Sequence, residues 1–388
     1  MEDMAGSGVV ALMPPFLSVG ASLTFLSTAR RRWPRAMPSR LQIGGDSLQN
    51  RQIFFLNRPD GDLTPDVFQE RVVDIDPPGD GEILCRNLTV SIDPYLRLKM
   101  YDRRSYTPPL QIGEPIPGRS VAEVVESRAQ GYAPGDHVAI FGGWQQYTVV
   151  RGNAAQKIDL SIASAGAWLG PLGMTGMTAY AGLLHIGRPQ AGETLVVSGA
   201  AGAVGSLVGQ IGRISGCRVV GIAGSEEKCR VVVEEFGFDA CLNYREPKLA
   251  TRLEKACPEG CDIYFDNVGG EISRTVSTLF NDFGRFVVCG LISQYSGQQA
   301  AEPTVYDEFM RLVLTRRLTV RGFIVSDIEA EYPEFEGRMA DWLKAGTIVH
   351  REHVRHGFEN IVPAFLGMLS GENTGKSIVH IAEDKQAS

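Results

Sequence analysis

The sequence contains few cysteines, and their spacing does not suggest pairs. Seven are spread over 388 residues, at positions 85, 217, 229, 241, 257, 261 and 289. An odd, scattered set is not typical of a disulfide framework and indicates reduced thiols in a cytosol-like compartment. Cys257 and Cys261 are the nearest two, and no second pair lies near them to complete a four-ligand zinc site. We therefore predict a cytoplasmic protein without a structural metal.

The sequence also lacks an excess of positive charge and an uninterrupted hydrophobic run of membrane length. Its formal net charge is −7 at pH 7, so no basic face is expected and no nucleic-acid partner is predicted. The apolar stretch GVVALMPPFLSVGASLTFLSTA is broken by Pro14 and Pro15, whereas a spanning helix needs about 20 apolar residues. We predict no membrane span.

Residues 1–47 differ in character from the rest of the chain. Glu2 and Asp3 precede the apolar stretch and clustered arginines follow it, which reverses the order of a secretory signal. Three interpretations stay open: a disordered tail, an upstream start codon with Met37 as the true first residue, and an organelle transit peptide. We treat residues 1–47 as an extension that we expect to be disordered.

In the remaining sequence, the pattern of expected strands and helices changes near residue 165, which indicates two domains. Before that point, segments such as VVDIDPPGDGEILCRNLTVSID alternate apolar and polar residues around turn signals, as in a β-rich, barrel-like domain. After it, TLVVSG, RVVGIAG, ACLNY and CDIYFDNVG predict strands that alternate with helices, as in a doubly wound parallel sheet. We predict a β-rich domain over 48–165, completed by 326–388, and a dinucleotide-binding domain over 166–325.

A glycine motif stands where the first strand of the second domain should meet its helix. In VVSGAAGAVGSLVG, the residues Gly199, Gly202 and Gly205 allow a tight turn and a close approach of backbone N–H groups to a pyrophosphate. The spacing is G-x-x-G-x-x-G, and the commoner motif is G-x-G-x-x-G. Because the motif lies inside an alternating strand–helix pattern, phosphate binding is favoured over a merely structural turn.

The end of the second strand indicates which dinucleotide binds. NAD sites place a carboxylate there, about 20 residues after the glycines, to bind the ribose hydroxyls. This sequence has Gly224 and Ser225 at that point, and Lys228 follows. Glu226 and Glu227 would argue for NAD unless they point outward. A lysine ammonium can pair with a ribose phosphate, so the sequence predicts NADP.

Several motifs together are similar to those of zinc-independent medium-chain reductases of the leukotriene and prostaglandin reductase type, the alkenal double-bond reductases. They are SIDPYLRLKM, PLGMTGMTAYAGLL, GAAGAVGS, YFDNVGG, CGLISQY, GFIVSD and GENTGK, and the resemblance spans residues 50–382. It implies a GroES-like β domain joined to a Rossmann domain. It also implies NADPH-dependent reduction of the C=C bond of α,β-unsaturated ketones or aldehydes, including oxo-prostaglandin-like ones, and a homodimer.

The resemblance also implies roles for individual residues. Tyr295 would be catalytic, its hydroxyl bonding the nicotinamide ribose. Tyr95, Arg119 and Ser326 would border the substrate, although Tyr95 is equally interpretable as a packed aromatic and Arg119 is more simply a solvent-facing cation. The cofactor would be contacted by Gly202, Ala203, Val204, Gly205, Lys228, Tyr244, Asn267, Cys289, Gly290, Leu291, Ile292, Ser293, Tyr295, Phe323, Ile324, Val325 and Asn373.

Within this superfamily, zinc alcohol dehydrogenases carry a Gly-His-Glu motif that this sequence does not have. Gly118, Arg119 and Ser120 stand in its place, and neither His137 nor His185 has a suitable cysteine at ligand spacing. Without a Lewis acid, alcohol oxidation is the less favoured chemistry. An NADPH-dependent quinone reductase and a non-enzymatic cofactor-binding protein remain the alternatives.

Overall fold

The structure, a computed structural model, describes residues 42–43, 46–102, 105–295 and 304–382. Contacts divide the chain into residues 1–39 and residues 40–388, and the described helices and strands all lie in the second unit. The predicted extension, residues 1–47, lies outside the described residues except for the two short strands β1 (Gln42–Ile43) and β2 (Asp46–Ser47). Among the described residues, no helix is long and apolar enough to cross a bilayer.

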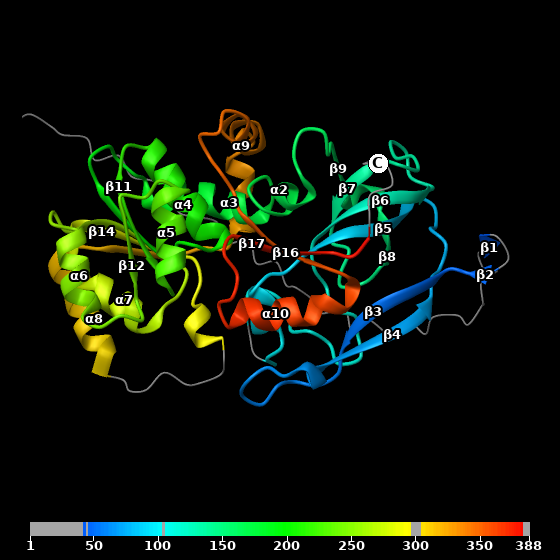
Figure 1. The fold of residues 1–388 in the computed structure, drawn as a ribbon, viewed down its shortest axis with the longest axis horizontal. Coiled ribbons are helices and arrows are strands. Elements are labelled where there is room, and N and C mark those ends of the chain that lie inside the picture. Colours follow the sequence, from blue (N-terminus) through cyan, green and yellow to red (C-terminus); the bar gives the residue numbers. More distant parts are fainter. Residues whose placement is uncertain (1–41, 44–45, 103–104, 296–303, 383–388) are drawn as a thin grey trace, which may run out of the picture. The chain divides into compact units, whose positions relative to one another are not determined.

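A six-stranded parallel sheet with helices on both sides forms the second half of the chain (Figure 1). Its strand order is β12-β11-β10-β13-β14-β15, and every neighbouring pair is parallel. The strands are β10 (Thr194–Ser198), β11 (Arg218–Ala223), β12 (Ala240–Asn243), β13 (Cys261–Asp266), β14 (Phe280–Val288) and β15 (Thr319–Gly322). The intervening helices are α4 (Ala203–Ile214), α5 (Glu226–Glu234), α6 (Leu249–Ala256), α7 (Gly270–Ser277) and α8 (Thr304–Arg316). The predicted doubly wound sheet is confirmed.

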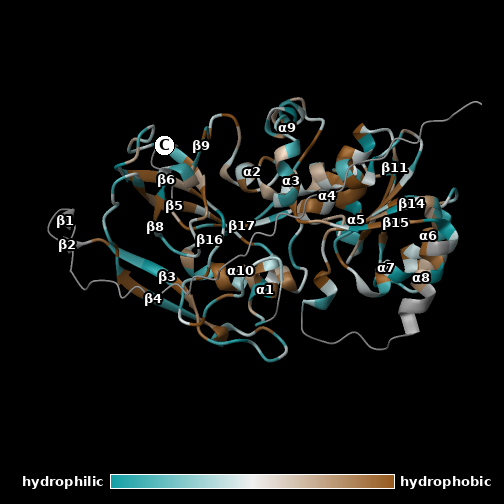
Figure 2. Cartoon of the chain, turned by 180° about the vertical axis from the view of Figure 1, so that it is seen from behind, coloured by the Kyte–Doolittle hydropathy of each residue, from teal (hydrophilic) through white to brown (hydrophobic). Residues whose placement is uncertain are grey.

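Burial of both faces explains why the strands of this sheet are so apolar. Leu195 and Val197 of β10 pack into one core with α4, whereas Val196 between them packs into a second core with α6 and α7. Successive strand residues point to opposite faces, so a strand covered on both sides must be apolar throughout. Brown, hydrophobic residues accordingly run along these strands in Figure 2.

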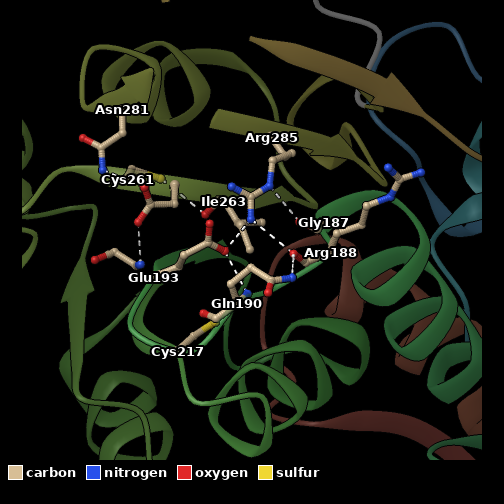
Figure 3. A network of polar contacts seen from close by, with 11 residues as sticks. Gly187, Arg188, Gln190, Glu193, Cys217, Cys261, Ile263, Asn281 and Arg285 are labelled. Carbon is tan, nitrogen blue, oxygen red and sulfur yellow. Dashed lines mark hydrogen bonds and ion pairs between the residues drawn. The ribbon is translucent and has the colours of Figure 1, made fainter. Parts of the chain in front are cut away.

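A polar network joins residues at the amino-terminal side of the strands in this sheet (Figure 3). Arg285 of β14 donates to the carbonyl of Gly187 at 2.9 Å and pairs with Glu193, which lies just before β10. Glu193 also accepts from the backbone N–H of Gln190 at 2.9 Å. We assign this network to the structure of the sheet, because it lies at the opposite ends of the strands from the glycines.

The other domain is built on a seven-stranded sheet, which combines strands from the first part of the described chain with two strands from its C-terminal part. Its order is β16-β17-β5-β6-β7-β9, and β8 also pairs with β5. The strands are β5 (Glu82–Ser91), β6 (Ser120–Ser127), β7 (His137–Ile140), β8 (Tyr147–Arg151), β9 (Gln156–Ile158), β16 (Glu352–His356) and β17 (Lys376–His380). A separate hairpin joins β3 (Gln49–Phe55) to β4 (Phe68–Asp74). The helices here and between the domains are α1 (Tyr95–Lys99), α2 (Ala165–Leu169), α3 (Met174–Ala181), α9 (Phe335–Lys344) and α10 (Ile361–Leu369).

A buried ion pair fixes the returning tail against this sheet. The Lys376 ammonium lies 2.8 Å from the Asp93 carboxylate and 2.7 Å from the Ser91 hydroxyl. The side chains of the pair are only 3% and 4% exposed. The tail strand β17 is thereby held next to the segment that leads into α1 and Tyr95. The exact domain bounds, 48–165 with 326–388 and 166–325, stay a prediction.

Candidate active site

The glycine motif forms a compressed turn between β10 and α4. Gly199 adopts a φ of +61°, which favours glycine. A side chain at Gly205 would place its Cβ 2.3 Å from the Gly199 carbonyl oxygen, so only glycine lets α4 start this close to the strand. The first N–H groups of a helix lack intrahelical acceptors, and Gly202, which begins α4, has no side chain to cap them. The turn therefore offers Ala203, Val204 and Gly205 N–H groups to an anion.

The tail of the chain lies directly over this turn. Gly375 donates its N–H to the Ala201 carbonyl at 2.7 Å and forms a bridge with Gly202. In the same loop, the Asn373 amide donates to the Gly375 carbonyl at 2.9 Å. The structure thus brings Asn373 to the glycine turn, although about 170 residues of sequence separate them.

Lys228 and Tyr244 both lie near the carboxyl end of β11, and their binding of a ribose phosphate stays a prediction. Ser225 caps α5 by accepting from the Lys228 N–H at 3.2 Å, and Tyr244 donates its N–H to the Ala223 carbonyl. The Lys228 ammonium donates to the Gly371 carbonyl at 2.6 Å. Glu226 and Glu227 are exposed on the outside of the same helical turn, so no carboxylate side chain ends β11.

Arg245 adds a second cation near Lys228, and no motif in the sequence marks it. Its guanidinium lies 5.8 Å from the centre of the Tyr244 ring. Burial first and the neighbouring Arg245 charge second lower the pKa of Lys228. Two neighbouring cations form a favourable site for a phosphate, whose negative charge would offset their repulsion.

A buried carboxylate organises the ends of the central strands. The Asp266 side chain is fully buried and accepts from the Ser198 hydroxyl at 2.8 Å and from the N–H groups of Val268 and Gly269. Next to it, Asn267 is held by Ser198, whose carbonyl accepts from the Asn267 amide at 2.8 Å. These contacts hold Asn267 at the carboxyl edge of the sheet, where ligands bind in doubly wound folds.

The segment from Cys289 to Tyr295 is fixed to the same edge. Cys289 and Gly290 both donate their N–H groups to the Asp266 carbonyl, at 2.9 and 3.0 Å. Ile292 donates to the Asn267 carbonyl, and Ser293 donates to the Val268 carbonyl. The predicted cofactor residues Cys289, Gly290, Leu291, Ile292 and Ser293 therefore follow the backbone of the 266–268 turn closely.

Tyr295 stands where the two domains meet. The Tyr101 hydroxyl, which comes from the segment after α1, donates to the Tyr295 carbonyl at 3.0 Å. Burial raises the pKa of the Tyr295 phenol to about 12, although a Leu291 N–H acts in the opposite direction. At neutral pH the phenol is therefore protonated and able to donate a hydrogen bond.

Tyr95, Arg119 and Tyr106 lie close enough to one another for the charge or dipole of the last two to act on Tyr95. Tyr95 is half-buried at the start of α1, so it begins a helix and does not end a strand. Burial and the nearby Asp93 raise its pKa, whereas the Arg119 charge lowers it. The Tyr106 hydroxyl interacts electrostatically with those of Tyr95 and Tyr295. Tyr106 was not predicted, because no sequence motif marks it.

The remaining predicted residues lie in the segment that follows β15 (Thr319–Gly322). Phe323 packs near Gly182 and stacks edge-on with Phe265 at 6.3 Å between ring centres. Ile324 and Val325 follow it, and Ser326 is exposed in the short turn Val325–Asp327. Hollows of about 450 Å³ and 800 Å³ lie beside β9 and α9, and no predicted site residue lines either of them.

Comparisons with known proteins place this geometry in a family. A family described as "N-terminal domain of oxidoreductase" matches residues 51–158, and one described as "Zinc-binding dehydrogenase" matches residues 203–344. The chain is 42% identical to the NADPH-dependent curcumin reductase of Escherichia coli over 88% of this chain and 100% of that protein. The chain belongs to the medium-chain dehydrogenase/reductase family.

Other relatives place this medium-chain reductase among the zinc-independent double-bond reductases. It is 39% identical to the 2-alkenal reductase (NADP(+)-dependent) of Nicotiana tabacum, over 79% of this chain and 90% of that one. The crystal structure of CurA in complex with NADPH from Vibrio vulnificus matches with a TM-score of 0.83 and 42% identity, over 86% and 99% of the two chains. The predicted family and its two-part fold, GroES-like and Rossmann, are confirmed.

One matching family is described as zinc-binding, whereas the described part of this medium-chain reductase shows no set of zinc ligands. Among the residues that the structure describes, no three His, Cys, Asp or Glu side chains are grouped to hold a metal. Gly118 and Ser120 are buried in the β-rich domain, where the Ser120 hydroxyl donates to Asn87 at 2.9 Å. The expectation that no metal takes part in the reaction stays a prediction.

Proposed function

We propose that this protein uses NADPH to reduce the C=C bond of α,β-unsaturated ketones and aldehydes. The observation that carries the proposal is the pairing of two sites at one sheet edge. A two-cation site at Lys228 and Arg245 lies at the end of β11, and a protonated phenol at Tyr295 lies at the domain junction. Membership of the double-bond reductases supports the same chemistry.

The residues present fit NADPH. The glycine turn would hold the pyrophosphate at the start of α4, and Lys228, Tyr244 and Arg245 would hold the ribose phosphate. No carboxylate stands at the end of β11 to favour NADH, because Ser225 takes that place and caps α5. Asn267, the segment from Cys289 to Tyr295, residues 323–325 and Asn373 would surround the nicotinamide end.

The chain would assist the reaction by orienting the substrate and stabilising charge on its carbonyl oxygen. When bound, NADPH supplies the hydride that is delivered to the β-carbon of the substrate. Tyr295 would position the ribose hydroxyl that hydrogen-bonds the carbonyl oxygen, where negative charge grows as the enolate forms. Solvent water would then protonate the α-carbon. Donors that act on charge in the transition state are worth about 2.7–4 kcal/mol each.

Tyr95 and Tyr106 would line the substrate site, and the exposed residues Arg119 and Ser326 would lie on its solvent side. An oxo-prostaglandin-like substrate would place its carboxylate near Arg119, yet this side chain is exposed and its charge is screened by solvent. A simple enone or alkenal is therefore the substrate class that we propose. A homodimer and a cytoplasmic location are part of the same proposal and come from the family resemblance and the cysteine pattern.

The test is a screen of NADPH oxidation against enones, alkenals and quinones, with NADH as the control. The proposal requires turnover of enones or alkenals that is faster with NADPH than with NADH. Turnover of quinones alone would instead support the quinone reductase alternative. Cofactor binding without turnover of any substrate would support the non-enzymatic alternative.

A further inference from the structure

Two of the scattered cysteines lie in direct contact in the folded chain. Cys229 is in the first turn of α5, and Cys241 is the second residue of β12. Their sulfur atoms are 3.1 Å apart, although 12 residues separate them in the sequence. Both are free thiols in this structure. A disulfide bond length is about 2 Å, so the sulfurs need to approach each other by about 1 Å to bond.

We infer that Cys229 and Cys241 form a disulfide on oxidation, and that this disulfide weakens NADPH binding at the ribose-phosphate end. The first part stands on the sulfur contact alone. The second part rests on the proposed function, because it takes Lys228 and Tyr244 as the phosphate site. Lys228 directly precedes Cys229, and Tyr244 follows Cys241 by three residues.

The surroundings of the pair favour Cys229 as the reacting sulfur. The Cys241 thiol donates to the Cys229 sulfur, and this contact lowers the pKa of Cys229 despite its burial. Glu226 and Glu246 oppose that shift. Burial raises the pKa of every cysteine outside the pair, Cys85, Cys217, Cys257, Cys261 and Cys289. Cys241 is partly exposed, which gives an oxidant access to the pair.

The oxidant would be hydrogen peroxide. Cys229 first loses its proton, and its thiolate attacks one peroxide oxygen. The O–O bond breaks, the leaving hydroxide takes up a proton to become water, and Cys229 becomes a sulfenic acid. The Cys241 sulfur then attacks the Cys229 sulfur, the S–S bond forms, the S–O bond breaks, and a second water leaves. Two thiols lose two electrons and two protons, and one peroxide becomes two waters.

The position of the pair explains how this bond would act on the cofactor. The disulfide would draw the first turn of α5 toward β12 and shift Lys228 from the place where Ser225 and Gly371 now hold it. NADPH depends on that lysine through its phosphate, whereas NADH has no phosphate there. By linkage, bound NADPH should protect the pair from oxidation to the same degree that the disulfide weakens NADPH binding.

The bond itself is tested by peptide mass spectrometry of the full-length protein. Reduced protein is treated with hydrogen peroxide, remaining thiols are alkylated, and the digest is searched for a linked Cys229–Cys241 peptide. We expect this peptide in the wild type and in Cys217→Ser, and its loss in Cys229→Ser and in Cys241→Ser. Cys217 is a suitable control because a serine there can still donate to the Gln190 carbonyl. Equal alkylation of Cys229, Cys241 and Cys217 in peroxide-treated wild type would overturn the inference, whether or not the variants fold.

The effect on the cofactor is tested by binding, not by activity. We expect the NADPH Kd of the oxidised wild type to rise about tenfold, the NADH Kd to stay within about twofold, and dithiothreitol to reverse the change. A linked peptide with an unchanged NADPH Kd would overturn the regulatory half. If Lys228→Ala leaves NADPH binding of the reduced protein unchanged, the phosphate site of the proposed function fails, and a linked peptide would still confirm the pair.

Discussion

The two ends of the candidate site are built in different ways. At the ribose-phosphate end, Lys228 lies in α5 and Tyr244 directly follows β12, so both belong to neighbouring elements of one strand–helix–strand unit. At the reacting end, Tyr295, Tyr106 and Tyr95 meet across a junction of loops and a short helix from both domains. The first end depends on regular backbone geometry, and the second depends on contacts between distant segments. We expect the first to govern cofactor choice and the second to govern turnover.

Both ends depend on the returning tail, and breaking the ion pair that holds it should have the largest effect. Lys376→Met leaves the Asp93 carboxylate buried without its partner, which should cost about 3–5 kcal/mol of unfolding free energy. Urea unfolding measures the loss. The matched control is Lys157→Met, because Lys157 also lies 2.8 Å from an aspartate, Asp136, but is 54% exposed. An exposed pair should cost at most about 1 kcal/mol. Equal losses in the two variants would show that burial does not decide the strength of the pair.

Removing the phenol at the reacting end should affect turnover and spare cofactor binding. We expect Tyr295→Phe to lower kcat with a simple enone by about 10²–10³-fold, because the ribose hydroxyl that donates to the developing charge is no longer held in position. The NADPH Kd should stay within about twofold. Steady-state kinetics with direct binding measurements separates the two, and an unchanged kcat would remove Tyr295 from the mechanism.

The pH profile provides an independent check on the same residue. Burial raises the pKa of the Tyr295 phenol to about 12 from its usual value of about 10. A phenol with a raised pKa keeps its proton longer as the pH rises. We therefore expect kcat to show no loss from tyrosine ionisation up to about pH 10. A fall in kcat centred below pH 9, absent in Tyr295→Phe, would contradict this.

At the ribose-phosphate end, we expect a substitution to weaken NADPH binding and to leave kcat nearly unchanged. Lys228→Ala should raise the NADPH Kd by about 10–100-fold, since a hydrogen bond to a charged group is worth about 1.5–3 kcal/mol. It should leave the NADH Kd and the kcat at saturating NADPH nearly unchanged. Lys255→Ala serves as the control, because Lys255 is exposed on α6. Equal losses for NADPH and NADH would show that Lys228 does not bind a phosphate.

Arg119 should give the smallest effect. Its side chain is exposed, so we expect Arg119→Ala to change the KM of a neutral alkenal and of an acidic enone alike, within about twofold. Parallel steady-state measurements on the two substrates decide this. A rise of tenfold or more for the acidic enone alone would show that Arg119 binds a substrate carboxylate.

The difference between the two ends of the site also explains which site residues can be predicted from the sequence. The glycine turn, Lys228 and the missing carboxylate stand at fixed offsets along one strand–helix–strand unit, so local spacing was enough to predict them. Tyr295 was identified only through the family resemblance. Tyr106 and Tyr101 were missed, because the contact between Tyr101 and Tyr295 joins residues 194 positions apart. Arg245 follows Tyr244 directly, and only its place beside Lys228 shows its relevance.

The cysteines show most clearly that distance along the sequence does not predict which side chains are in contact in the fold. Counting them along the chain predicted reduced, unpaired thiols, and all seven are free in the structure. Sequence distance pointed to Cys257 and Cys261 as the nearest two, whereas the fold brings Cys229 and Cys241 into contact. Packing of α5 on β12 creates that contact, and no local pattern in the sequence encodes it.

Isotope transfer is the most direct test of the central claim that hydride reaches a conjugated C=C bond from NADPH. The reduced protein is incubated with a simple enone and with NADPH deuterated at both C4 positions of its nicotinamide ring, and the product is examined by NMR. The account predicts one deuterium at the former β-carbon and an intact carbonyl group. Deuterium on the carbonyl carbon of an alcohol product, or no transfer at all, would contradict it.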